Sequence, residues 1–206
     1  MENSTDLAIL QVFAKLLNHE AQNCLSRPFV KYIETNQPTI ARKHFFGLRE
    51  AKVDLVGIAL FDHLESQLQS ENGLTETMWR RNEIENYFCT EKVLLAYATH
   101  DLPDDLFRAA DSQLREQAMR ESIAEVTKLL EIDDLNPWSP DVKASDQVLD
   151  RVFRLFFKKL GLPLRLRKSE YHILASLMPP GELDAEISEK LDTIVEVSKL
   201  AKPTVD

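Results

Sequence analysis

The feature that most constrains the fold is an apolar run that stops abruptly at an acidic residue. Residues 56–61 read Val-Gly-Ile-Ala-Leu-Phe, and Asp62 follows at once. An uninterrupted apolar run of this length is typical of a parallel strand that helices bury on both faces. Because ligands of open α/β sheets bind outside the carboxyl ends of the strands, Asp62 stands where chemistry is commonly placed.

The rest of the first half alternates between helical and extended patterns, which predicts an α/β domain over residues 1–100 with a parallel sheet flanked by helices. Ser4 or Thr5 caps a first amphipathic helix, and residues 28–35 read as a short strand. The stretch from Ser70 to Thr77 reads as a polar loop. The remaining expected elements are a helix at 39–52, a short strand entering a turn at 78–88 and a helix at 90–99.

From about Asp101 the pattern becomes purely helical, so residues 101–206 are predicted to form an all-helical C-terminal extension. Ser145 is expected to cap a Phe-rich helix that ends at Gly161 and Pro163. We expect the phenylalanines of this helix to serve core packing.

Composition excludes some classes of protein. The 206 residues carry a formal net charge of −9, which argues against a simple basic nucleic-acid binder but not against a nuclease. No apolar run reaches the roughly 18–20 residues of a membrane span, and the N-terminus does not resemble a signal peptide. Two cysteines without metal-type spacing indicate a reducing compartment, so we expect a cytoplasmic protein with no membrane association.

Acidic residues recur at the ends of the predicted elements, where they are candidate ligands for a hard cation. They are Glu2, Asp6, Asp62, Glu65, Glu83 and Glu85. Mg²⁺ prefers one or two carboxylates together with water and substrate phosphate, and two such ions clamp a phosphoryl displacement. The duller alternatives are favourable charges at a helix N-terminus for the first two acids and ion pairs with Arg80 and Arg81 for the last two.

Three segments resemble the TOPRIM nuclease half of OLD-family (overcoming lysogenization defect) proteins. They are "MENSTDLAIL", "LVGIALFDH" and "WRRNEIENYF", the last resembling the R-x-E-I-E-N-Y segment of that family. The likeness covers most of the chain. It implies Mg²⁺- or Mn²⁺-dependent cleavage of DNA, in phage defence or DNA processing, beside an ABC-type ATPase partner chain or by self-association.

The resemblance also implies roles for particular residues. Glu2, Asp6, Asp62, Glu83 and Glu85 match the metal-binding acids, with Glu2 and Asp62 also catalytic. Lys168 in the helical half is a further catalytic candidate that would contact phosphate.

Three positions depart from the family pattern. Asn3 stands where the family has Gly, Leu64 replaces the second aspartate, and Met1 directly precedes Glu2, so the expected first strand is missing. The chain also lacks a Walker A motif. A second hypothesis is therefore a truncated, inactive TOPRIM-like protein that binds a partner chain through an unpaired sheet edge. A Mg²⁺-binding receiver-like domain is a weaker third, because it has no place for the "EIENY" segment.

Overall fold

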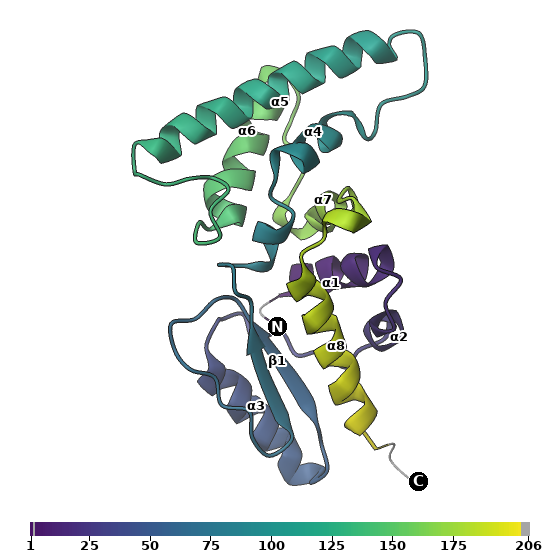
Figure 1. Cartoon of the computed structure of the whole chain (residues 1–206), viewed down its shortest axis with the longest axis vertical. Helices are drawn as coiled ribbons and strands as arrows, with labels where there is room; N and C mark the ends of the chain where they lie inside the picture. Colours follow the sequence, from purple (N-terminus) through teal and green to yellow (C-terminus); the bar gives the residue numbers. More distant parts are fainter. Residues whose placement is uncertain (2, 203–206) are drawn as a thin grey trace. The chain divides into compact units, whose positions relative to one another are not determined.

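The computed structural model describes Met1 and residues 3–202, and it confirms an α/β protein with a small parallel sheet flanked by helices (Figure 1). The chain divides into two compact units. Unit 1 comprises residues 1–80 and 180–206, and unit 2 comprises residues 81–179. The last long helix therefore belongs with the N-terminal part of the chain, although its sequence pattern had placed it in the helical extension.

The sheet of unit 1 consists of two parallel strands, β1 (Gly57–Phe61) and β2 (Leu74–Met78). The predicted apolar run is thus a strand, and its register pairs Gly57 with Leu74 and Phe61 with Met78. Helix α3 (Pro38–Ala51) covers one face, where a buried cluster holds the sheet to the helix. The cluster comprises Ala41, Phe45, Ala59, Phe61 and Leu74.

The predicted polar loop at residues 70–77 is wrong in its second half, where β2 begins. Asn72 and Gly73 both have positive φ values (48° and 85°), which two-residue turns of the primed types require. Glu71 and Leu74 close this turn with two backbone hydrogen bonds of 3.0 and 2.8 Å. The turn sets the start of β2, so polar residues that read as loop in the sequence form a strand.

Three helices complete unit 1: α1 (Ser4–Leu16), α2 (Ala21–Ser26) and α8 (Ala185–Leu200), with a short 3₁₀ turn, η4 (Pro180–Glu182), before α8. The cap of α1 is Asn3, whose side-chain oxygen accepts from Thr5 N at 2.7 Å. The predicted strand at residues 28–35 is also wrong, because the segment joins no ladder. A backbone hydrogen bond of 3.2 Å joins Ile33 N of this segment to Met1 O.

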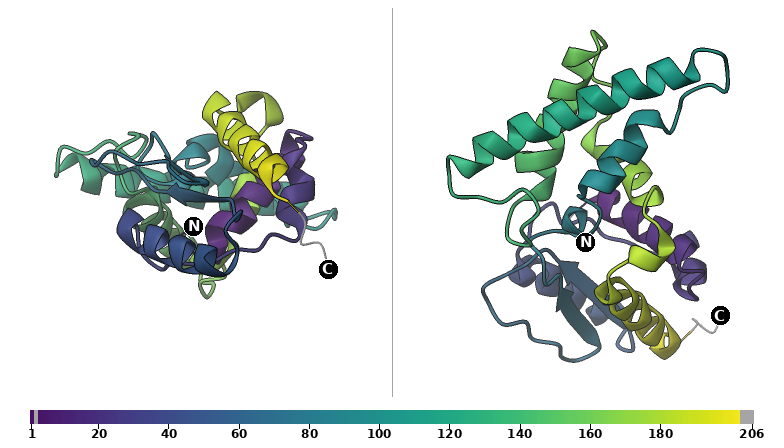
Figure 2. Two further views of the ribbon diagram at one scale, coloured as in Figure 1. Left: turned by 90° about the horizontal axis from the view of Figure 1, so that it is seen from below. Right: turned by 45° about the horizontal axis from the view of Figure 1, so that its top comes forward.

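Unit 2 is built from four α-helices joined by short turns: α4 (Glu91–Thr99), α5 (Arg108–Glu131), α6 (Asp150–Lys159) and α7 (His172–Ser176). The 3₁₀ turns η1 (Ile84–Tyr87) and η3 (Lys168–Glu170) and a π-helical turn, η2 (Ala144–Leu149), lie between them. Figure 2 shows α5 lying across α6. The Phe-rich helix serves core packing as predicted, since Phe153, Phe156 and Phe157 are buried.

Candidate functional site

The opening of unit 2 places two carboxylates in the protein interior. Glu83 and Glu85 are only 2% and 3% exposed, and Trp79, Tyr87 and Phe88 beside them in the sequence are buried as well. Glu83 precedes the turn η1, and its backbone N donates to the side-chain oxygen of Asn86 at 3.0 Å. This local bond fixes the backbone from which both acids project.

The amide of Asn86 fastens this turn to a distant part of unit 2. Its Nδ2 donates to the backbone oxygens of Val142 at 2.9 Å and Ser139 at 3.3 Å. Asn82 adds two more bonds, from its backbone N to Pro140 O at 2.7 Å and from its side chain to Asp141 O at 2.9 Å. The segment between α5 and η2 therefore holds η1 in place through residues 139–142.

The turn η2 brings a serine and a lysine to the carboxylate of Glu83. Ser145 N donates a short hydrogen bond to Glu83 Oε1, and Lys168 Nζ lies 3.0 Å from Ser145 Oγ. The sequence predicted Ser145 as a helix cap, which is wrong because no side-chain cap bond precedes η2. Its hydroxyl instead contacts Lys168, so Lys168 reaches Glu83 through Ser145. π-Helical turns of this kind occur frequently at functional sites.

Burial dominates the electrostatics of this cluster, which we call the Glu83 cluster: Glu83, Glu85, Ser145, Asp146, Lys168 and Tyr171. Burial raises the pKa of Glu83, and the Ser145 hydrogen bonds and the charges of Lys168 and Lys143 partly oppose it. Lys143 and then Lys168 hold the pKa of Asp146 below its ordinary value. Burial followed by neighbouring acids raises the pKa of Tyr171, whose hydroxyl donates to Ser145 O at 3.4 Å.

Cys89 follows η1, and its thiol is affected by burial and by the two neighbouring acids. Burial raises the pKa of its thiol, and the negative charges of Glu83 and Glu85 raise it further. A thiol in this state is a poor nucleophile, because the thiolate is the reactive form. Cys89 is therefore a packing residue of the cluster.

The other predicted acids belong to unit 1 or lie outside the described residues. Asp62 follows β1 directly, as expected. Asp6 completes the cap of α1 by accepting from Asn3 N at 3.3 Å, which is the duller role considered for it. Glu2 lies outside the described residues. Glu65 follows Asp62 in the loop after β1 and is exposed.

Whether the Glu83 cluster suits Mg²⁺ depends on its donor atoms. Within residues 1 and 3–202, no three His, Cys, Asp or Glu side chains gather closely enough to enclose a metal. Mg²⁺, however, is commonly held by one or two carboxylates, with water and substrate phosphate completing its shell. Glu83 and Glu85 supply hard oxygen donors of that type and number.

Sequence reasoning missed two buried acids in unit 1. Glu76 on β2 accepts from Arg42 Nε at 2.7 Å, Arg42 Nη2 at 2.5 Å and Gln69 N at 2.9 Å. Glu186 on α8 accepts from Arg80 N at 2.9 Å and lies 3.3 Å from Lys190 Nζ. Only the alternation Leu-Thr-Glu-Thr-Met around Glu76 signalled its strand, and no pattern signalled Glu186.

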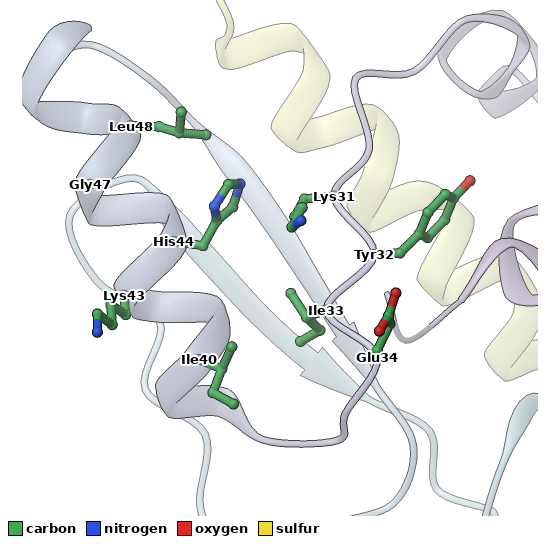
Figure 3. Close-up of a pocket in the computed structure, with 9 residues that line it drawn as sticks. All are labelled: Lys31, Tyr32, Ile33, Glu34, Ile40, Lys43, His44, Gly47 and Leu48. Atoms are coloured by element: carbon green, nitrogen blue, oxygen red, sulfur yellow. The ribbon is translucent and has the colours of Figure 1, made fainter.

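A groove of about 530 Å³ lies on unit 1 between α3 and residues 31–34 (Figure 3). Its walls mix apolar side chains with Lys31, Lys43 and Glu34. The Nε2 of His44 is buried there without a hydrogen-bond partner among the described residues. The groove holds none of the predicted site residues.

Comparison with known proteins leaves the family open. No protein-family model, curated protein or solved structure matches this chain. Among the described residues, no helix has both the length and the apolar character needed to cross a bilayer. The resemblance to OLD-family nucleases therefore stays a prediction that rests on the quoted motifs.

Proposed function

We propose that this protein is a metal-dependent DNA endonuclease whose site includes the Glu83 cluster. The observation that carries the proposal is the placement of Lys168 beside Glu83, although 85 positions separate them in the sequence. Buried Glu83, linked to Lys168 through Ser145, brings together a group that holds a cation and a group that contacts phosphate. A buried acid with a perturbed pKa and a specific charge partner is typical of functional sites.

Each residue has a distinct part in this proposal. Glu83 and Glu85 hold Mg²⁺ or Mn²⁺, which when bound activates water and offsets charge on the phosphate. Lys168, whose side chain is 45% exposed, binds a non-bridging phosphate oxygen from the solvent side. Ser145 is a positioning residue, since its N–H orients Glu83 and its hydroxyl orients Lys168.

The acidic residues of unit 1 are included in the proposal because of the resemblance to OLD-family nucleases. By the resemblance, Asp62 at the carboxyl end of β1, Glu2 and Asp6 are proposed as metal ligands within unit 1. An asparagine at position 6 can still accept the hydrogen bond from Asn3 N. Asp6→Asn is therefore expected to have the smallest effect among substitutions of the proposed metal ligands.

A plasmid-nicking assay tests the proposal with Mg²⁺, with Mn²⁺ and with EDTA. Glu83→Gln and Lys168→Met are each expected to lower the nicking rate by about 10²-fold or more, the usual cost of removing one group that stabilises the transition state. Glu196→Gln and Lys128→Met serve as matched controls, because both side chains are exposed and lie outside the Glu83 cluster. Absence of nicking by folded protein, or nicking that survives Glu83→Gln, would contradict the proposal.

A second candidate function, binding a partner chain by strand addition, is favoured by the edge of β1. The bonds from Gly57 N to Gly73 O (2.9 Å) and from Trp79 N to Phe61 O (3.0 Å) show which residues face β2. By the alternation of a parallel ladder, Ala59 faces β2 as well, while Ile58 and Leu60 direct their backbone groups to the other edge. No hydrogen bond joins these two backbones to any described residue.

The two edges of the sheet differ in this respect. The outer edge of β2 is covered, because Glu76 N donates to Ser70 Oγ at 2.9 Å. Helix α8 packs against β1, but the backbone groups of Ile58 and Leu60 have no hydrogen-bond partner among the described residues. Such unpaired backbone groups are a template for another strand. We propose an extended apolar strand of a partner chain, such as an ATPase subunit, as its occupant.

Hydrogen exchange tests this second function with a synthetic peptide, a Val/Ile hexamer flanked by lysines. Ile58 and Leu60 amides are expected to gain protection when the peptide is added, while Ala59 and Phe61, already bonded to β2, change little. A peptide with proline at its central position is the control. Equal protection of all four amides, or of none, would contradict strand addition.

A further inference from the structure

One stretch of unit 2 departs sharply from the acidic character of the chain. Residues 143–168 contain eight Lys or Arg and two Asp or Glu, a formal net charge of +6 in a protein of net charge −9. The preceding residues 101–142 contain four Lys or Arg and eleven Asp or Glu. A single unit thus holds an acidic and a basic segment in succession.

The basic segment folds back on itself, so we call residues 143–168 the basic hairpin. Its outgoing arm is η2 followed by α6, which ends where Gly161 N donates to Lys158 O at 3.1 Å. Its return arm, residues 162–167, leads to Lys168. Because Lys168 lies 3.0 Å from Ser145 and 3.6 Å from Asp146, the return arm ends beside the start of the outgoing arm.

The outgoing arm presents its cations on one face of α6. Arg151, Arg154 and Lys158 are exposed, and their spacing of three and four residues places them along the same side of the helix. The opposite face is buried through Val152, Phe153, Phe156 and Phe157. Lys159 belongs to that inner side, since its ammonium pairs with Glu121 at 3.2 Å and Glu125 at 2.7 Å on α5.

The return arm adds two more exposed cations. Leu166 is buried, while Arg165 and Arg167 on either side of it are exposed. Because Leu166 between them is buried, Arg165 and Arg167 both face solvent. No ion pair to a described residue occupies Arg151, Lys158, Arg165 or Arg167. Arg154 pairs with Asp150 at 2.9 Å.

We infer that the basic hairpin binds the phosphate backbone of duplex DNA and leads it to Lys168 and the Glu83 cluster. The inference rests on the proposed nuclease function for its destination, but binding itself needs no metal. Exposed cations without acidic partners are what phosphate contacts require, and their release of counterions makes binding depend on salt rather than on base sequence. The acidic segment 101–142 repels the duplex and so confines it to the hairpin.

The test is binding of the full chain to a fluorescent 25-base-pair duplex in EDTA, measured by anisotropy over a series of salt concentrations. Arg165→Gln with Arg167→Gln removes the return arm, and Arg151→Gln with Lys158→Gln removes the outgoing arm. Each pair is expected to weaken binding roughly tenfold near 0.1 M salt and to reduce the slope of log K against log salt by about 2. A second duplex of unrelated sequence is expected to give the same losses.

The matched control is Arg27→Gln with Lys128→Gln, which removes the same charge from exposed positions outside the hairpin. Circular dichroism confirms that each variant is folded. The inference is overturned if both hairpin variants bind like the control. It is also overturned if the protein binds duplex RNA, or vesicles containing phosphatidylserine, more tightly than the DNA duplex.

The outcomes separate this inference from the proposed function. Binding that requires the hairpin, without nicking in Mg²⁺ or Mn²⁺, keeps the inference and overturns the nuclease. Nicking that both hairpin variants retain at the parent rate and affinity keeps the nuclease and overturns the inference.

Discussion

Glu76 in unit 1 and Glu83 in unit 2 are equally inaccessible carboxylates with opposite environments. Glu76 lies on β2 and Glu83 directly precedes η1, and each is no more than 6% exposed. Glu76 accepts two hydrogen bonds from one guanidinium and a third from Gln69 N. Glu83 accepts a hydrogen bond from Ser145 N, and Lys168 donates to the serine hydroxyl.

The difference distinguishes a structural acid from one available for chemistry. A bidentate guanidinium contacts both oxygens of Glu76, and Gln69 N adds a third hydrogen bond. Burial of Glu83 is offset only in part, which leaves its pKa raised. An incompletely neutralised buried carboxylate gains most from an added cation, which is why the metal proposed above is placed at Glu83 and not at Glu76.

The largest expected effect is on the paired acid. Glu76→Ala leaves Gln69 N without its acceptor and is expected to lower the free energy of unfolding by about 3 kcal/mol. Urea unfolding followed by circular dichroism measures it, with exposed Glu50→Ala on α3 as the control. A loss no greater than that of the control would remove the distinction between the two acids.

A smaller and pH-dependent effect is expected for Glu83→Gln. Because the folded-state pKa of Glu83 lies above its ordinary value near 4.5, the folded protein binds the proton more tightly than the unfolded chain. The free energy of unfolding therefore falls as pH rises from the ordinary pKa near 4.5 to the raised pKa of the folded state, and it then levels off.

The glutamine variant lacks that decline, so its free energy of unfolding relative to the parent rises with pH. Urea titrations at pH 5, 6, 7 and 8 measure the trend. Glu76→Gln is the comparison variant. If the free energy of unfolding of Glu83→Gln differs from that of the parent by the same amount at every pH, the pKa of Glu83 is not raised in the folded protein.

The sequence predicted the elements whose signals are local. The apolar run of β1 needs no partner to be recognised, and the structure confirms it as a strand. The turn before β2 was also visible as Asn-Gly, yet the polar residues after it masked the strand. Glu76 stands in that strand only because Arg42 pairs with it from α3.

The candidate site depends on contacts that no local pattern contains. Lys168 contacts Ser145 although 23 positions separate them in the sequence, and the resemblance alone had pointed to this lysine. The alternative prediction that Arg80 forms an ion pair with Glu83 or Glu85 is wrong, because its guanidinium pairs with Glu189 on α8. Ser145 was likewise predicted to cap a helix, because helical periodicity cannot distinguish a π-helical turn from the start of an α-helix. Ser145 lies inside the π-helical turn η2.

The smallest expected effect is the coupling between Lys168 and Glu83, and it decides whether the two act together. In a double-mutant cycle of Lys168→Met and Glu83→Gln, the coupling free energy at pH 7 is expected to be favourable but only about 0.5 kcal/mol, since Lys168 is half exposed and screened by solvent. The coupling should shrink in 1 M NaCl, because the interaction passes through charge rather than a direct hydrogen bond. Lys128→Met with Glu83→Gln is the control cycle and should give no coupling. A Lys168 coupling equal to that control would leave Lys168 beside Glu83 only through Ser145, with its charge directed to the phosphate and not to the acid.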